Sequence, residues 1–244
     1  MKKFICQLFI LFGIVCPSYA QDIERTFTKA LSFIPNKFLP TNPYNVVSDK
    51  QYPVVIYLHG CTGINEHDIV WAKFINELGF VVVMPNSFAT WRTQNCDPNS
   101  RTSGLYKGDV FKLRSLEAEH AYGELIKLPW VDKSKIYLMG HSEGAQGTAR
   151  SSIDGIKGYI ISGWTCTHKI NNERHGLRTP MNSPVLAVSY TNDPWRHREH
   201  TQGRCIDVAN GRSVEQVDLE GRFHGTSSNL DARNAVKTFL EKNN

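Results

Sequence analysis

A chain of 244 residues is long enough for one sizeable α/β core and too short for two comfortable domains. Its composition, 41% hydrophobic and 21% charged, is ordinary for a soluble protein. The net charge of +5 is only mildly basic, and no block of Lys and Arg is interleaved with aromatic residues, so nothing indicates a nucleic-acid partner.

The first twenty residues have the pattern of a secretory signal. Met1 is followed by two lysines, residues 4–15 are apolar, and a small-x-small cleavage site ends at Ala20. We therefore expect residues 1–20 to be a signal peptide and residues 21–244 to be a single domain, exported to the periplasm or secreted. The apolar run is too short for a comfortable membrane span, so we expect no stable membrane anchor after cleavage.

The cysteines fit an exported protein. Cys6 and Cys16 would leave with the signal; lipidation at Cys16, or an N-terminal core helix in place of a signal, is the alternative. Four cysteines remain, an even number in an oxidising compartment: Cys61, Cys96, Cys166 and Cys205. They allow three pairings, and the residues alone do not choose between them.

Strand and helix patterns alternate along the chain. A first strand is expected over 26–33, and the later strands over 52–58, 80–84, 136–139, 158–162, 184–190 and 214–219. Helices are expected over 66–78, 108–127, 145–152 and 229–242. The pattern predicts an α/β fold with a mostly parallel central sheet flanked by helices, and with functional loops at the carboxyl ends of the strands.

The sequence Gly140-His-Ser-Glu-Gly144 lies between an expected strand and an expected helix. A sharp turn there would expose the Ser142 side chain, and the two glycines would let strand and helix cross closely. A glycine-rich turn with a solvated serine is the alternative. A serine hydroxyl needs a base to take its proton and a carboxylate to orient that base before it acts as a nucleophile.

An acid and a base follow later strands. Asp193 comes directly after the strand over 184–190, and His224 lies in a Gly-Arg-Phe-His-Gly loop after the last strand. Asp193 as a turn residue and His224 as a surface residue are the alternatives. Asp218 and Glu220 are rival acids, but they precede His224 too closely to come from a different strand.

With the order Ser, Asp, His, and with His59-Gly60 after a strand, the chain resembles the α/β-hydrolases, and within them the dienelactone hydrolase-like family. The resemblance covers nearly all of residues 50–240 and implies an α/β-hydrolase fold. It also implies a serine hydrolase that cleaves a small-molecule carboxylic ester through an acyl-enzyme, without metal or organic cofactor.

The resemblance also implies roles for individual residues. Ser142 would be the nucleophile, His224 the base and Asp193 its partner, with the backbone N–H groups of Glu143 and Cys61 forming the oxyanion hole. His59 and His141 would be structural, because neither takes the position of the base. Dienelactone hydrolases proper are cytoplasmic and carry a cysteine nucleophile, so a general carboxylesterase is expected here.

The strand order of this fold suggests how the cysteines pair. The strand ending before His59 neighbours the strand ending at Met84, and the strand ending at Ser162 neighbours the strand ending at Tyr190. Disulfides Cys61–Cys96 and Cys166–Cys205 would each brace a long loop beside the site.

Aromatic and cationic side chains in the long loops suggest a substrate pocket: Trp91, Arg92, Trp164 and Trp195. A solvated cationic rim is the alternative. His197 and His200 have a zinc-like spacing, but the neighbouring arginines oppose a cation, so no metal site is expected. The same triad could serve a peptidase or an acyltransferase, and a catalytically silent hydrolase-fold binding protein is the alternative from another class. No oligomeric state follows from the sequence.

Overall fold

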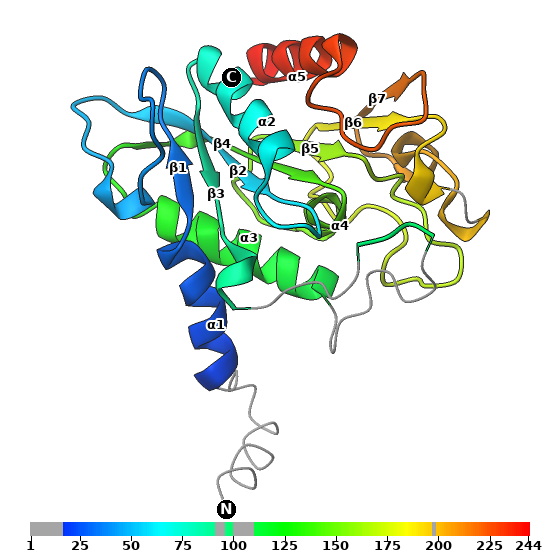
Figure 1. Cartoon of the computed structure of the whole chain (residues 1–244), viewed down its shortest axis with the longest axis horizontal. Coiled ribbons are helices and arrows are strands. Elements are labelled where there is room, and N and C mark those ends of the chain that lie inside the picture. Colours follow the sequence, from blue (N-terminus) through cyan, green and yellow to red (C-terminus); the bar gives the residue numbers. More distant parts are fainter. Residues whose placement is uncertain (1–16, 91–95, 100–109, 197–198) are drawn as a thin grey trace, which may run out of the picture.

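The computed structural model describes residues 17–90, 96–99, 110–196 and 199–244. Within these ranges seven strands form one sheet in the order β1-β3-β2-β4-β5-β6-β7 (Figure 1). The strands are β1 (Leu31–Phe33), β2 (Tyr52–Leu58), β3 (Val81–Met84), β4 (Val131–His141), β5 (Tyr159–Ser162), β6 (Val185–Tyr190) and β7 (Val214–Leu219). β1 is antiparallel to β3, and the other neighbouring pairs are parallel. The prediction of a mostly parallel sheet is therefore confirmed.

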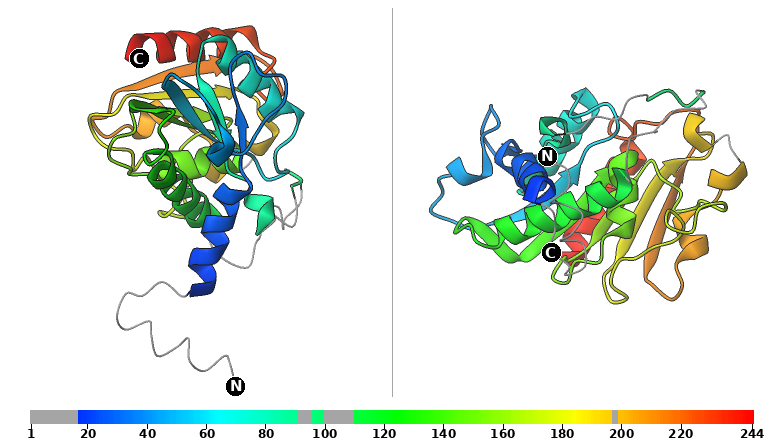
Figure 2. Two further views of the ribbon diagram at one scale, coloured as in Figure 1. Left: turned by 90° about the vertical axis from the view of Figure 1, so that its left-hand side faces the viewer. Right: turned by 90° about the horizontal axis from the view of Figure 1, so that it is seen from below.

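Helices cover both faces of this sheet (Figures 1 and 2). On one face lie α2 (Glu66–Glu77) and α5 (Leu230–Asn243), and on the other lie α3 (Val110–Leu125) and α4 (Glu143–Arg150). A further helix, α1 (Pro17–Thr28), contacts α3. The carboxyl ends of the parallel strands are thus left to the loops, which is where ligands bind in folds of this kind.

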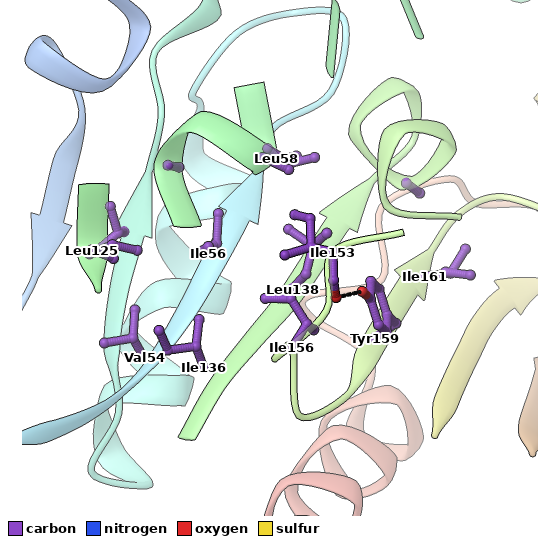
Figure 3. Close-up of a cluster of buried hydrophobic side chains, with 14 of the residues drawn as sticks. Val54, Ile56, Leu58, Leu125, Ile136, Leu138, Ile153, Ile156, Tyr159 and Ile161 are labelled. Carbon is purple, nitrogen blue, oxygen red and sulfur yellow. Dashed lines mark hydrogen bonds between the residues drawn. The ribbon is translucent and has the colours of Figure 1, made fainter. Parts of the chain in front are cut away.

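The central strand β2 shows why these segments are continuous apolar runs. Val54, Ile56 and Leu58 pack toward α3 and α4, whereas Val55 and Tyr57 pack toward α2 and α5. Figure 3 shows the first set among side chains of β4, β5 and α3. Because both faces of the strand are buried, every position is apolar, and no polar alternation appears.

The first expected strand, over residues 26–33, is wrong in its first half. The chain is helical to Thr28, and only Leu31–Phe33 pairs with β3. Ile23 and Phe27 stand one helical turn apart and are both buried. Phe27 thus reaches the core from a helix, and its spacing to Leu31 and Phe33 only resembles strand alternation.

In the part of the chain that the structure describes, no helix combines the length and apolar character needed to cross a membrane.

Candidate active site

The turn between β4 and α4 has the geometry that the glycine-serine pattern predicts. Ser142 has φ 57° and ψ −114°, a strained conformation for a residue with a side chain. Its N–H donates to the carbonyl oxygen of Ser162 at the end of β5 (2.9 Å). A strained residue held in place by the neighbouring strand is the arrangement by which a nucleophile is presented at a sheet edge.

The two glycines of the pattern are required by backbone contacts. A side chain at Gly144 would collide with the carbonyl oxygen of Leu58, and one at Gly140 would collide with the carbonyl oxygen of Gly144. Helix α4 therefore crosses directly over the end of β2, which brings Ser142 next to Gly60.

Asp193 and His224 meet across the ends of β6 and β7. Nδ1 of His224 lies 2.7 Å from Oδ2 of the buried Asp193, whose Oδ1 accepts the N–H of Trp195 (2.8 Å). Because a carboxylate can only accept, the imidazole proton is on Nδ1 and Nε2 keeps its lone pair. Among the described residues Nε2 of His224 is buried without a hydrogen-bond partner. This ring nitrogen therefore has a lone pair that no described residue uses.

The rival acid Asp218 is occupied elsewhere. It accepts a hydrogen bond from Gln216 (3.0 Å) and forms an ion pair with Arg204 (3.6 Å). Asp218 lies on the edge strand β7, and the carboxylate that hydrogen-bonds His224 is that of Asp193.

The histidines that flank the site, His59 and His141, have lowered pKa values. Burial and the charge of Arg114 hold the pKa of His59 well below its usual value. Burial, His67 and His224 do the same for the pKa of His141, whose ring centroid lies 4.8 Å from that of His224. Both imidazoles therefore stay uncharged at neutral pH.

A buried ionic network beneath the turn was not anticipated from the sequence. Arg114 of α3 is fully buried and pairs with Glu117 (2.6 Å) and with Glu143 (3.5 Å). Its guanidinium also contacts the hydroxyl of Ser87 and the carbonyl oxygen of His59. One side chain thus connects the loop after β2, the loop after β3 and the start of α4.

The loop after β2 is also fixed internally. The carbonyl oxygen of Gly60 lies 2.7 Å from Nδ1 of His59 and accepts the N–H of Gly63 (3.2 Å). This carbonyl belongs to the same peptide unit as the N–H of Cys61, so holding one fixes the direction of the other. Glu143 is the first residue of α4, directly after Ser142.

Two disulfides brace the carboxyl edge of the sheet. Cys61 is joined to Cys96 and Cys166 to Cys205, with Cα–Cα distances of 6.0 and 4.8 Å. β2 does neighbour β3, and β5 does neighbour β6. Each disulfide therefore links loops that follow adjacent strands.

Removing the second disulfide should mainly cost stability. The variant Cys166→Ala/Cys205→Ala should lose about 2–4 kcal/mol of unfolding free energy, because the bond closes a loop of 39 residues. Urea titration of the oxidised proteins measures this. Adding reductant should lower the unfolding free energy of the parent more than that of the variant, because the variant has only the Cys61–Cys96 disulfide left to lose. An unchanged urea midpoint in the variant would show that this disulfide does not stabilise the fold.

A polar cavity of about 560 Å³ adjoins the acid of this site. It is lined by Asp193 together with Asn99, Asn192, Arg196 and Arg222. The guanidinium of Arg196 donates to the carbonyl oxygens of Tyr190 and Gly203, both at 2.7 Å, so this cation holds the loop together.

Of the aromatic residues expected around a pocket, Trp195 lies beside the site, with its ring centroid 5.7 Å from that of His224. Trp164 directly follows Gly163, where a side chain would meet His141 and His224. Trp91 and Arg92 lie outside the described residues.

Within the described ranges, no three His, Cys, Asp or Glu side chains are grouped so as to hold a metal ion. His200 packs against His168, at 4.8 Å between ring centroids, and His197 lies outside the described residues.

No protein-family model and no curated protein matches this sequence. Solved structures do match, and they identify the fold. A protein described as a dienelactone hydrolase from Klebsiella pneumoniae is 14% identical with a TM-score of 0.61, over 87% of this chain and 90% of its own. The chain has the α/β-hydrolase fold.

Two further neighbours have the same fold at similarly low identity. S-formylglutathione hydrolase from Agrobacterium tumefaciens is 17% identical with a TM-score of 0.59, over 80% of this chain and 86% of its own. Est1E from Butyrivibrio proteoclasticus is 16% identical with a TM-score of 0.56, over 88% of this chain and 93% of its own. The neighbours are thus esterases and other hydrolases.

Proposed function

We propose that this chain is an exported serine hydrolase that cleaves a carboxylic ester through an acyl-enzyme intermediate. The observation that carries the proposal is the hydrogen bond between Asp193 and His224, which leaves a basic nitrogen at the same sheet edge as the strained Ser142. Esterases and hydrolases among the structural neighbours support the class of reaction.

Each step of the reaction has a residue to perform it. Ser142 Oγ attacks the ester carbonyl and gives its proton to Nε2 of His224, while the carboxylate of Asp193 stabilises the imidazolium that forms. The N–H groups of Glu143 and Cys61 bind the oxyanion. His224 then protonates the leaving alcohol, and later takes a proton from the water that releases the acid. The same residues would serve an amide or an acyl acceptor other than water.

Export is supported by two features. The first twenty residues have the pattern of a cleavable signal, and the described cysteines are all in disulfides, which persist in oxidising compartments.

Labelling with a fluorophosphonate tests the nucleophile without knowledge of the substrate. The purified protein should be labelled, and Ser142→Ala should not, since the probe reacts only with an activated serine. The variant removes one oxygen atom from a turn whose fold depends on Gly140 and Gly144, so it should remain folded. Equal labelling of both would place the reactive serine elsewhere. No labelling of either folded protein would favour a hydrolase-fold binding protein.

A panel of substrates then separates the chemistries. It should contain p-nitrophenyl acetate and butyrate, methyl ferulate and the matching amides. Methyl ferulate is included because ferulic acid binds the neighbour Est1E and because Trp195 lies beside His224. Turnover of amides at rates comparable to the esters would assign a peptidase instead.

A further inference from the structure

The loop that carries His224 is fastened to helix α2 by two side chains. Nε2 of His67 accepts the backbone N–H groups of Thr226 (3.0 Å) and Ser227 (3.3 Å). Nε1 of the buried Trp71, one helical turn further along, donates to Oγ1 of Thr226 (3.3 Å). These contacts join parts of the chain that are about 155 to 160 residues apart.

The two N–H donors determine the state of the His67 ring. Because both point at Nε2, that nitrogen has a lone pair, so the proton of the neutral ring is on Nδ1. Nδ1 lies 3.5 Å from Oδ1 of the buried Asp68. Asp68 is itself held by Tyr57 (2.9 Å) and by the N–H of Asn65 (3.0 Å), as part of the cap of α2. The start of α2 thus fixes the ring that fastens the loop.

The same contacts continue to the turn that carries Ser142. The hydroxyls of Thr226 and Ser162 lie 2.6 Å apart, and that of Ser162 lies 3.1 Å from Nδ1 of His141. The ring centroids of His67 and His141 are 4.0 Å apart.

The space around His67 is also filled. A side chain at Gly225 would come within 3.0 Å of its ring. The backbone directly after His224 therefore has little room to shift while His67 is in place.

We propose that His67 is a positioning residue for His224, accepting the N–H groups of Thr226 and Ser227 so that the imidazole of His224 is held at the sheet edge that carries Ser142. The proposal rests on the proposed function for its kinetic consequence. His67 does not touch substrate in this scheme, so its loss should lower kcat and leave KM nearly unchanged, because only the alignment of base and nucleophile is disturbed.

Two substitutions at His67 form a matched pair. His67→Gln keeps an acceptor oxygen near the place of Nε2, whereas His67→Leu has a similar volume and no acceptor. We expect His67→Leu to lower kcat by about 10–100-fold with KM within about twofold, and His67→Gln to stay within about threefold of the parent. The rate of fluorophosphonate labelling should follow kcat. Equal losses in both variants would overturn the positioning role.

NMR spectroscopy of the histidine side-chain nitrogens tests the contact itself and does not depend on activity. In the unmutated protein, Nδ1 of His67 should be protonated and Nε2 should not. The opposite tautomer would overturn the proposal. The amide signals of Thr226 and Ser227 should shift in His67→Leu and much less in His67→Gln.

The two measurements separate the proposals. An inactive parent with the expected tautomer would remove the proposed function and the kinetic role but retain the contact. An active parent with the opposite tautomer would leave the proposed function intact. If His67→Leu fails to fold, the tautomer and the kinetics of His67→Gln decide. The proposal expects kcat of the glutamine variant within about threefold of the parent, because its amide oxygen replaces Nε2 as the acceptor, and a larger loss in the folded variant would overturn it.

Discussion

Replacing Asp193 by asparagine should lower kcat by about 10⁴-fold, the loss typical of a triad whose histidine takes the wrong tautomer. An asparagine amide can present an N–H to Nδ1 of His224, and the ring proton then moves to Nε2, which leaves that nitrogen without the lone pair that the proposed mechanism requires. The asparagine oxygen can still accept the N–H of Trp195, so the loop should keep its shape. Steady-state kinetics on the best ester of the panel measures the change.

Asp218→Asn is the control for this prediction. Asp218 contacts Gln216 and Arg204 and has no described contact with His224, so its variant should keep kcat within about twofold. If Asp193→Asn retained a tenth of the parent activity, another carboxylate or no carboxylate would be serving His224.

Replacing Arg114 by methionine should lower the free energy of unfolding by about 3–5 kcal/mol, because it leaves a buried carboxylate without its cation. Burial raises the pKa of the fully buried Glu117 above its usual value, and Arg114 and the hydroxyl of Ser87 offset part of that rise. Without Arg114 the carboxylate would have to take up a proton or be desolvated as an ion. Urea denaturation at neutral pH measures the loss.

A second substitution tells charge from packing. Arg114→Met/Glu117→Gln has no unpaired charge at this pair and should recover part of the loss. Lys127→Met breaks the exposed pair with Glu124 and should cost less than about 1 kcal/mol. A loss below that same value in Arg114→Met would mean that the buried network contributes little to stability.

The central strands could be predicted because most of them contain a short run of β-branched and aromatic residues between turn signals. Tyr52–Leu58 is such a run, and it forms β2 with those bounds. The segment 26–33 failed for a physical reason. Over so few residues, its apolar positions fit both the helical and the strand period. Packing of α1 against α3 stabilises the helix.

The candidate site was predictable where a residue lies in the loop that follows a strand. Asp193 and His224 are found in this way, because the ends of parallel strands share one edge. Arg114 and His67 were not, because their partners lie on other elements far along the chain. One signal was available: Arg114 and Glu117 stand three residues apart on an otherwise apolar helix face, which is an unusual place for two charges.

The crossing of α4 over β2 limits how this protein can change. A Cβ added at Gly144 would collide with the carbonyl oxygen of Leu58, which is an atom of the main chain. A collision between side chains can be relieved by a second mutation elsewhere, but no substitution shortens a carbonyl group. Position 144 therefore has no compensating partner anywhere in the sequence, whereas the side-chain oxygen at position 142 can be exchanged without moving the crossing. Substitutions of the side chain at position 142 are thus compatible with this crossing, and any side chain at position 144 is not.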